Sequence, residues 1–352
     1  MTLSRSTIKP LNVDWLRSVT SARDGETKLG QDLTSFDGSA SVESFLTKCA
    51  ESGVKFALIG VPEDIGPRAN LGRGGAKGAW EAFLGQFANI QANQMFDHSH
   101  LAVLGAVDLG GIEEKSADSP AELRKLCEEI DEHVAAAVET IVKHGLEPIV
   151  IGGGHNNALP IMRGIVRARS AVSNSTFKLG CANLDVHLDF RRIEGRHSGN
   201  PFRYAYEEKL LHAYFALGTK DSYNSAESIE SLRRAGFHFV SYEDLFVRCC
   251  TTLDSAVDAA VNYFLNSSCF VGIELDLDSI NGLPASNPVV GGFTLEQGTR
   301  YIFSLSSRLP CAYLHLPEGA PAHAPDGERI VGRALLELVL AYVKGRAHCC
   351  LL

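Results

Sequence analysis

Eight short, continuously apolar runs recur along the chain, and stretches with mixed apolar and polar residues separate them. Runs without polar alternation are typical of strands that helices cover on both faces of a sheet. We therefore predict strands at 55–61, 101–107, 147–151, 178–184, 211–217, 237–240, 269–275 and 310–316.

The stretches between these runs have the spacing of amphipathic helices, with apolar residues recurring three and four positions apart. They predict helices at 76–87, 121–144, 157–169, 225–235, 253–265, 295–308 and 328–344. Regular alternation of strands and helices indicates a mostly parallel sheet between two helical layers. The expected fold class is a three-layer α/β/α domain.

The chain has 352 residues, which suits one large α/β domain with a sizeable core. We see no internal repeat and no Pro/Gly linker that would divide it. Residues 1–50 are polar and irregular, so we expect an N-terminal extension packed on a single domain of residues 51–352.

Composition narrows the classes of function and location. The net charge of −9 disfavours non-specific binding to nucleic acid or to an anionic membrane. We find no apolar run of about 18 residues that would span a membrane, and no signal peptide. Nine cysteines without a C-x-x-C pair indicate free thiols in the cytoplasm or another reducing intracellular compartment. Residues 349–352 (CCLL) have the form of a prenylation signal, but no basic run precedes them and we do not expect modification.

Residues that bear catalytic chemistry gather where the predicted strands end, which is where parallel sheets bind ligands. The run 147–151 leads into three glycines and His155, and the run 310–316 leads to Glu318. The runs 178–184 and 269–275 lead into D-V-H-L-D and D-L-D, whose polar members are Asp185, His187, Asp189, Asp276 and Asp278.

These residues predict a metal centre. In extended chain, every second side chain points the same way, so the triplet and the pair can each converge. Four carboxylates this close would repel one another unless cations were present, and two divalent ions balance their charge. Oxygen ligands with some imidazole suit Mn²⁺ or Mg²⁺-like ions. A glycine turn with a stray histidine, or one Asp-x-Asp helix cap, would explain single motifs but not their joint occurrence.

The order GGGHN, DVHLD and ELDLD resembles the ureohydrolase superfamily of arginases, agmatinases and formimidoylglutamases. The resemblance covers about residues 54–346 and includes the run 60–76. It implies an arginase-like, eight-stranded parallel sheet and a cluster of two Mn²⁺ ions per subunit. It implies that Asp185 and Asp276 bridge both ions. It also implies two further ligands for each ion that do not bridge: His155 and Asp189 bind the first ion, and His187 and Asp278 bind the second.

The resemblance also implies a mechanism. Two ions roughly 3.5–4 Å apart hold a hydroxide that attacks the trigonal carbon of an amidine-like group. Asp278 relays a proton to the departing amine, and Glu318 is a candidate to bond the formimino nitrogen.

The loop after the second motif distinguishes the members. Arg191 stands where arginases have Asn, and Phe202 stands where they have His, while Ser198 and Asn200 are retained and are candidates for substrate binding. Arg191 followed by SGNPF, GGGH in place of GGDH, and the run 314–321 all resemble formimidoylglutamases. The activity implied is hydrolysis of N-formimino-L-glutamate to glutamate and formamide, a step of histidine breakdown.

The substrate implied has two carboxylates, and Arg191 can bind one of them through a charge-assisted, bidentate contact. Arg68, Arg73, Arg196 and Arg203 are further basic candidates, with exposed surface arginines as the alternative. An arginine-rich mouth would repel agmatine, which is a dication. Asn156 and Asn157 follow His155 where many formimidoylglutamases have an acidic residue, which leaves the exact substrate open.

Two alternatives stay open at this point. The chain could be another ureohydrolase, such as an arginase, an agmatinase or a guanidino-acid hydrolase. It could also be a catalytically silent arginase-like protein that binds metal weakly or not at all. The expected partner is a small carboxylated substrate, without nucleic acid or membrane. The family often forms trimers or hexamers, so a homo-oligomer is also an expectation.

Overall fold

The structure is a computed structural model that describes residues 7–115, 117, 119–171 and 177–349. Ten strands form one sheet in the order β1-β4-β3-β5-β10-β9-β6-β7-β8, with β2 also paired to β4. Eight of them correspond to the predicted runs: β3 (Phe56–Gly60), β4 (Leu101–Val107), β5 (Glu147–Ile151), β6 (Leu179–Leu184), β7 (Leu211–Thr219), β8 (His238–Ser241), β9 (Phe270–Leu275) and β10 (Cys311–Leu316).

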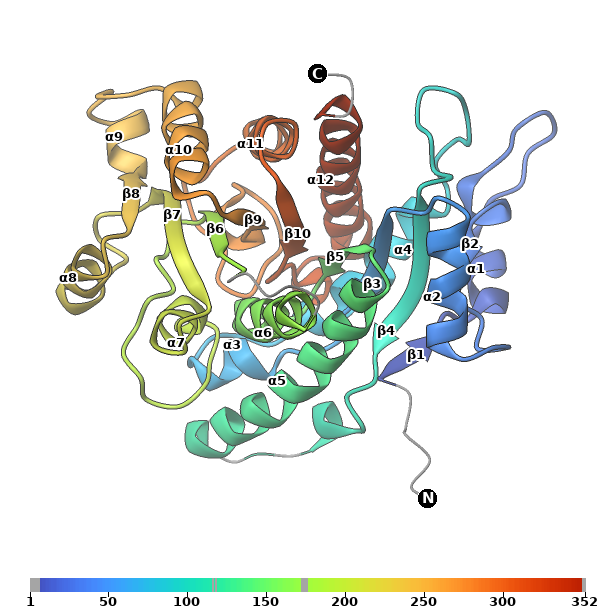
Figure 1. The fold of residues 1–352 in the computed structure, drawn as a ribbon, viewed down its shortest axis with the longest axis horizontal. Helices are drawn as coiled ribbons and strands as arrows, with labels where there is room; N and C mark the ends of the chain where they lie inside the picture. Colours follow the sequence, from blue (N-terminus) through green and yellow to red (C-terminus); the bar gives the residue numbers. More distant parts are fainter. Residues whose placement is uncertain (1–6, 116, 118, 172–176, 350–352) are drawn as a thin grey trace.

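All pairings among these eight strands are parallel. Helices cover both faces of the sheet, and Figure 1 shows one helical layer above it and another below it. The upper layer contains α10 (Leu253–Ser267), α11 (Leu295–Ser306) and α12 (Gly327–Cys349), and the lower layer contains α5 (Pro120–Lys143), α6 (Ala158–Ser170) and α7 (Pro201–Glu207). The predicted three-layer α/β/α fold is confirmed.

Each face of the sheet has its own hydrophobic core. One core joins Leu314 and Ile273 of the sheet to α4 (Ala79–Phe87), α11 and α12. The other joins Val150 of the sheet to α5 and α6. Because both faces of the central strands are buried, these strands have the continuously apolar sequences from which they were predicted.

Local signals set the helix boundaries. At the start of α5, the Ser119 hydroxyl accepts from the backbone N–H of Glu122, and the Glu122 carboxylate accepts from the backbone N–H of Ser119. Pro120 is the first helical residue, where its missing N–H costs nothing. Thr294 and Gln297 form the same reciprocal cap on α11. Such caps satisfy backbone donors that the first helical turn leaves unpaired.

The N-terminal fifty residues contribute to the sheet. β1 (Ile8–Pro10) pairs antiparallel with one end of β4, and β2 (Thr34–Ser35) pairs parallel with its other end. Strands of three and two residues have too little sequence pattern to predict. α1 (Val13–Val19) precedes β2, and α2 (Val42–Glu51) crosses residue 50, so the division of the chain at this residue stays a prediction.

The remaining elements are short or peripheral. Helices α3 (Ile65–Ala69) and α9 (Tyr242–Phe246) have five residues each and were not predicted, while α8 (Ala226–Arg234) was. Among the described helices, none combines the length and apolar character needed to cross a bilayer. Free thiols are found at Cys49, Cys127, Cys181, Cys249, Cys250, Cys269 and Cys311. The end of the CCLL sequence lies outside the described residues.

Candidate metal centre

Four adjacent strands position the candidate site. β5, β10, β9 and β6 are neighbours in the sheet and run parallel, so their carboxyl ends meet at one edge. The polar motifs follow directly: His155 after β5, Asp185 after β6, Asp276 after β9 and Glu318 after β10. All four side chains are buried.

The glycine turn before His155 depends on its sequence. Gly152 and Gly153 have φ angles of 82° and 72°, a region that other residues adopt only with strain. The buried carboxylate of Glu63 holds this turn, because its Oε1 accepts from the backbone N–H of Gly154 at 2.8 Å and from the side-chain amide of Asn157 at 2.6 Å. His155 is thereby fixed at the end of β5.

The second and third motifs lie beyond the strands, which corrects the extended-chain argument for their convergence. β6 ends at Leu184, so Asp185, His187 and Asp189 belong to the following loop, and Asp189 has a φ of 46°. Asp276 caps a single turn of 3₁₀ helix. The carboxylates converge because the backbone bends, not because side chains alternate along a strand.

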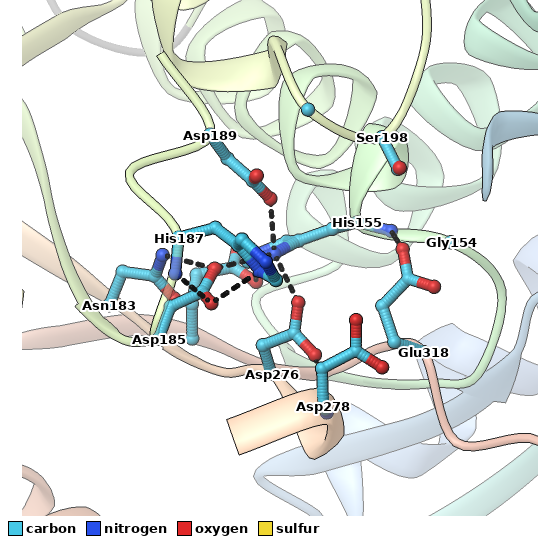
Figure 2. A network of polar contacts seen from close by, with 12 residues as sticks. Gly154, His155, Asn183, Asp185, His187, Asp189, Ser198, Asp276, Asp278 and Glu318 are labelled. Carbon is cyan, nitrogen blue, oxygen red and sulfur yellow. Dashed lines mark hydrogen bonds and ion pairs between the residues drawn. The ribbon is translucent and has the colours of Figure 1, made fainter. Parts of the chain in front are cut away.

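One ring nitrogen of His155 faces three carboxylates. Its Nδ1 lies 2.9 Å from Asp189 Oδ2, 3.0 Å from Asp276 Oδ2 and 3.4 Å from Asp185 Oδ2. Figure 2 shows these carboxylates gathered around the imidazole ring. The ligand-type atoms of His155, Asp185, Asp189 and Asp276 all lie within 4.8 Å of one another. The family resemblance assigns these four residues to the first ion.

The residues assigned to the second ion lie beside this group. His187 Nδ1 is 3.4 Å from Asp185 Oδ1, and its ring stacks on Tyr223 with centroids 5.7 Å apart. Asp278 Oδ1 accepts from the backbone N–H of Asn287 at 2.9 Å. Glu318 lies next to Asp278 in Figure 2, and its Oε1 accepts from the backbone N–H of His155 at 2.7 Å.

The charges in this site are not balanced by protein groups. Burial raises the pKa of Asp276 to about 6, and the Asp185 carboxylate adds to the shift. Burial and Asp276 raise the pKa of Asp278 well above its usual value. Burial opposes protonation of His187, but Asp185 outweighs this effect and raises its pKa to about 10. In the described part of the chain, the ion pairs recorded to these aspartates come from histidines.

The donor set fits divalent cations. A single N–H at His155 Nδ1 cannot satisfy three carboxylates, whereas a cation among them is attracted to all three and to the imidazole lone pair. Carboxylate oxygen with imidazole nitrogen is the chemistry that Mn²⁺ accepts. Asp278 and Asp185 add the negative charge that balances a second ion.

A cavity of about 730 Å³ opens above this group. His187, Asp189, Asp276, Asp278 and Glu318 line its floor, while Arg191, Arg192, Ser198, Asn70 and Tyr223 are among the residues of its wall and rim. The cavity is therefore large enough for an amino-acid-sized substrate and brings it against the carboxylate cluster.

The predicted substrate residues separate into two groups. Arg191 and Ser198 line the cavity, and the Arg191 side chain is 59% exposed. Asn200 is buried below the loop, where its amide oxygen accepts from Arg196 Nη1 at 2.9 Å. Arg68 pairs with Asp64 at 3.5 Å, and Arg73 donates to the Ser286 and Ala285 carbonyls. Neither they nor Asn200 are among the described lining residues.

The other two arginine candidates also have partners within the fold. Arg196 is 1% exposed, forms an ion pair with buried Asp131 at 2.8 Å, and donates to the Asn156 carbonyl at 2.8 Å. It ties the loop after Asp189 to the glycine turn that carries His155. Arg203 pairs with Glu207 at 2.9 Å near the surface. Of the five arginine candidates, Arg191 is among the described residues that line the cavity, and substrate contacts by the other four stay a prediction.

Sequence reasoning missed three buried groups that support the site: Glu63, the Asp131–Arg196 pair, and a cluster around Glu274. A signal existed for Glu274, because it is two residues before Asp276 in ELDLD. Burial alone would raise the pKa of Glu274, but His315 and His155 outweigh burial and lower the pKa to about 2. Asp131 had no such signal, since it lies on a long helix among other acidic residues.

The fold and this cluster of histidine and carboxylates define a protein of the arginase class. A sequence model of the Arginase family matches residues 54–341, and the chain belongs to this family. A formimidoylglutamase from Geobacillus sp. is 32% identical over 212 residues, which are 60% of this chain and 59% of that protein. A formimidoylglutamase from Psychrobacter cryohalolentis is 27% identical over 250 residues, covering 67% of this chain and 70% of the relative. The match thus spans less than two thirds of the Geobacillus protein.

Solved structures share the fold over most of the chain. The formimidoylglutamase of Bacillus subtilis superposes with a TM-score of 0.71 at 18% identity, covering 93% of this chain and 94% of that one. The Trypanosoma cruzi formiminoglutamase solved with Mn²⁺ gives a TM-score of 0.67 at 23% identity, covering 90% and 99%. At these identities the likeness extends to the fold.

Proposed function

We propose that this protein hydrolyses N-formimino-L-glutamate to glutamate and formamide at a centre of two Mn²⁺ ions. The observation that carries the proposal is the convergence of Asp185, Asp189 and Asp276 on His155 at the floor of a cavity with an arginine-bearing rim. The names of the relatives and the Mn²⁺ in the Trypanosoma structure support it.

The metal ligands in this proposal are His155, Asp185, His187, Asp189, Asp276 and Asp278. When bound, two Mn²⁺ ions supply Lewis acidity that lowers the pKa of water from about 15.7 toward 7. The loop geometry around these residues is fixed before metal binds, because Gly154, His155 and Asn157 are all held by buried carboxylates.

Asp278 has the position of a proton carrier. Its Oδ1 accepts from the backbone N–H of Asn287, so we assign proton transfer to Oδ2. There it takes a proton from the attacking water and delivers it to the amine nitrogen of glutamate as the C–N bond breaks. Burial, and after it the Asp276 carboxylate, raise the pKa of Asp278 in the metal-free protein.

Glu318 orients the amidine head. Its oxygens already accept from the His155 backbone and from Ser286, and each keeps a second lone pair. We assign one of these to the formimino N–H of the substrate. The φ of 69° at Glu318 is a strained conformation of the kind found at functional sites.

The rim of the cavity favours an anionic substrate. Arg191 and Arg192 line the cavity and share the carboxylate of Glu194, at 4.0 and 2.9 Å, and Arg124 pairs with it from outside the lining at 3.7 Å. Two lining guanidinium groups against this one carboxylate leave positive charge on this side of the mouth. We assign Arg191 to a substrate carboxylate and Ser198 to a hydrogen bond beside it, and the same field disfavours dicationic agmatine.

A substrate panel tests the proposal. Protein loaded with Mn²⁺ is given formiminoglutamate, arginine, agmatine and 4-guanidinobutyrate, and glutamate, formamide or urea is measured. We expect formiminoglutamate to give the highest kcat/KM. Preferred turnover of arginine or a guanidino acid would replace the proposed substrate. No turnover of any compound by protein that holds two ions would favour the silent alternative. Assembly into trimers or hexamers stays a prediction.

A further inference from the structure

A second polar cluster lies beneath the metal centre, inside the sheet. It consists of Glu274 on β9 and Tyr313 and His315 on β10, all completely buried. None of these residues was assigned a function above. Ionisable groups in the interior of a central sheet are costly unless they are paired, so their presence calls for an explanation.

The register of the two strands brings the cluster together. His315 is directly opposite Glu274, and Tyr313 is opposite Gly272. A Cβ on Gly272 would collide with the Tyr313 ring, so this glycine makes room for the ring to lie across β9. Tyr313 and His315 are two positions apart and reach the same carboxylate.

Two donors fix the Glu274 side chain. Its Oε1 accepts from the Tyr313 hydroxyl at 2.8 Å, and its Oε2 lies 2.6 Å from His315 Nδ1. A charged acceptor with two short hydrogen bonds is held firmly in place. Glu274 is therefore an anion with one orientation in the folded protein.

The anion faces the metal-ligand histidine from behind. Glu274 Oε2 lies 3.5 Å from His155 Nε2, while Nδ1 of the same ring points to Asp185, Asp189 and Asp276. Nε2 is buried and makes no hydrogen bond to a described group. The ring thus stands between two acidic clusters, one on each nitrogen.

This arrangement determines which nitrogen carries the proton. A carboxylate behind a ligand histidine accepts its second N–H, which keeps the lone pair of the other nitrogen free for the ion. We propose that Glu274, held by Tyr313 and His315, is a positioning residue that orients His155 and keeps its Nδ1 free to bind the first ion. The inference rests on the metal centre proposed above.

Glu274→Gln and Glu274→Leu test it by Mn²⁺ titration calorimetry of chelator-treated protein. Loss of such a partner costs about 10–100-fold in metal affinity, so we expect about tenfold for Gln and the upper value for Leu. Only one of the two binding steps should weaken. At one Mn²⁺ per subunit, electron paramagnetic resonance should show isolated ions held in the tighter site of the parent protein, and a larger signal from unbound Mn²⁺ in Glu274→Gln.

Glu147→Gln is a matched control. Glu147 is also a strand glutamate with a tyrosine donor, since Tyr342 donates to it, but it lies at the start of β5. It should lower the melting temperature and leave both Mn²⁺ affinities unchanged. The melting temperatures of the metal-free variants show whether a loss of Mn²⁺ affinity comes from a less stable fold or from a misplaced His155.

The outcomes are distinct. Parent protein that binds two ions, with Glu274→Gln and Glu274→Leu binding them equally well, overturns this inference alone. An equal loss of Mn²⁺ affinity in both binding steps, together with a matching fall in melting temperature, also overturns the inference, because a general structural defect would explain both changes. Parent protein that binds no Mn²⁺ overturns the proposed function and this inference with it.

Discussion

The two histidines of the proposed centre lie in opposite surroundings. His155 has a completely buried side chain, acidic groups on both ring nitrogens and the edge of Phe202 against its ring. His187 is 22% exposed, lines the cavity and is covered by the partly exposed ring of Tyr223. The His155 half is fixed by the fold, and the His187 half faces the substrate. We therefore expect the first ion to bind tightly and the second to exchange more readily.

The largest effect should come from a residue that serves both halves. Asp276 Oδ2 lies 3.0 Å from His155 Nδ1, and its Oδ1 accepts from the Asp278 backbone N–H at 2.7 Å. Asp276→Ala, like Asp185→Ala, should remove both ions and lower kcat by about 1,000-fold or more, because metal ions supply several kcal/mol of transition-state stabilisation. Metal content per subunit and formiminoglutamate turnover measure this.

Asp221→Ala is the control for that experiment. Asp221 is half exposed and paired with Arg248 on the surface, so its loss should change neither metal content nor activity. Near-normal Mn²⁺ in Asp276→Ala would contradict the shared role of this carboxylate.

The histidines themselves test the comparison directly. His155→Ala should lose the tightly bound ion and leave less than one Mn²⁺ per subunit after dialysis. His187→Ala should keep one ion. The affinity of the tighter Mn²⁺ site should be roughly tenfold or more higher in His187→Ala than in His155→Ala. Calorimetric titration of both variants measures this difference. Equal losses in the two variants would mean that burial of His155 does not distinguish the two sites.

Most of the fold could be predicted because its signals are local. Seven of the eight predicted strands are almost entirely buried, and their apolar runs stand out from the sequence, whereas β8 at the edge of the sheet is only partly buried. The strands β1 and β2 could not be predicted, because they are held by pairing with β4 rather than by a pattern of their own. Tertiary contacts decide such short elements.

The site could be predicted in its residues but less well in its geometry. His155, Asp185, Asp189 and Asp276 meet as their motifs suggested, although through loops rather than strand alternation. Arg196 illustrates the limit. Its sequence position suggests substrate binding, and only the structure places it against Asp131, 65 residues earlier on α5. Pairing over such a separation has no local signal.

Arg196 also provides a smaller and purely structural test of the half of the centre that contains His155. Arg196→Ala removes the fully buried partner of Asp131 and leaves it Arg163 at 3.3 Å, so we expect a cost somewhat below the about 3–5 kcal/mol of a broken buried pair. Arg203→Ala removes a surface pair with Glu207 and should cost about 0–1 kcal/mol. Urea unfolding of the metal-free proteins measures both. If the two variants lose similar free energies of unfolding, the buried Arg196 pair stabilises the protein no more than a surface pair does.

The smallest effect is expected at the rim of the cavity, in the half of the centre that contains His187 and faces the substrate. Arg191→Ala removes a charge-assisted bond to a substrate carboxylate, which is worth about 1.5–3 kcal/mol, so KM for formiminoglutamate should rise roughly tenfold or more. Mn²⁺ content and kcat should stay close to those of the parent, since Arg191 is 59% exposed and contacts no metal ligand among its recorded ion pairs.

Arg192→Ala is the matched control, because Arg192 pairs with the same Glu194 and is even more exposed. If Arg192→Ala raises KM as much as Arg191→Ala, the rim attracts the substrate through its summed charge and Arg191 makes no particular bond. If neither variant changes KM, the half that contains His187 recognises the substrate through groups other than its arginines.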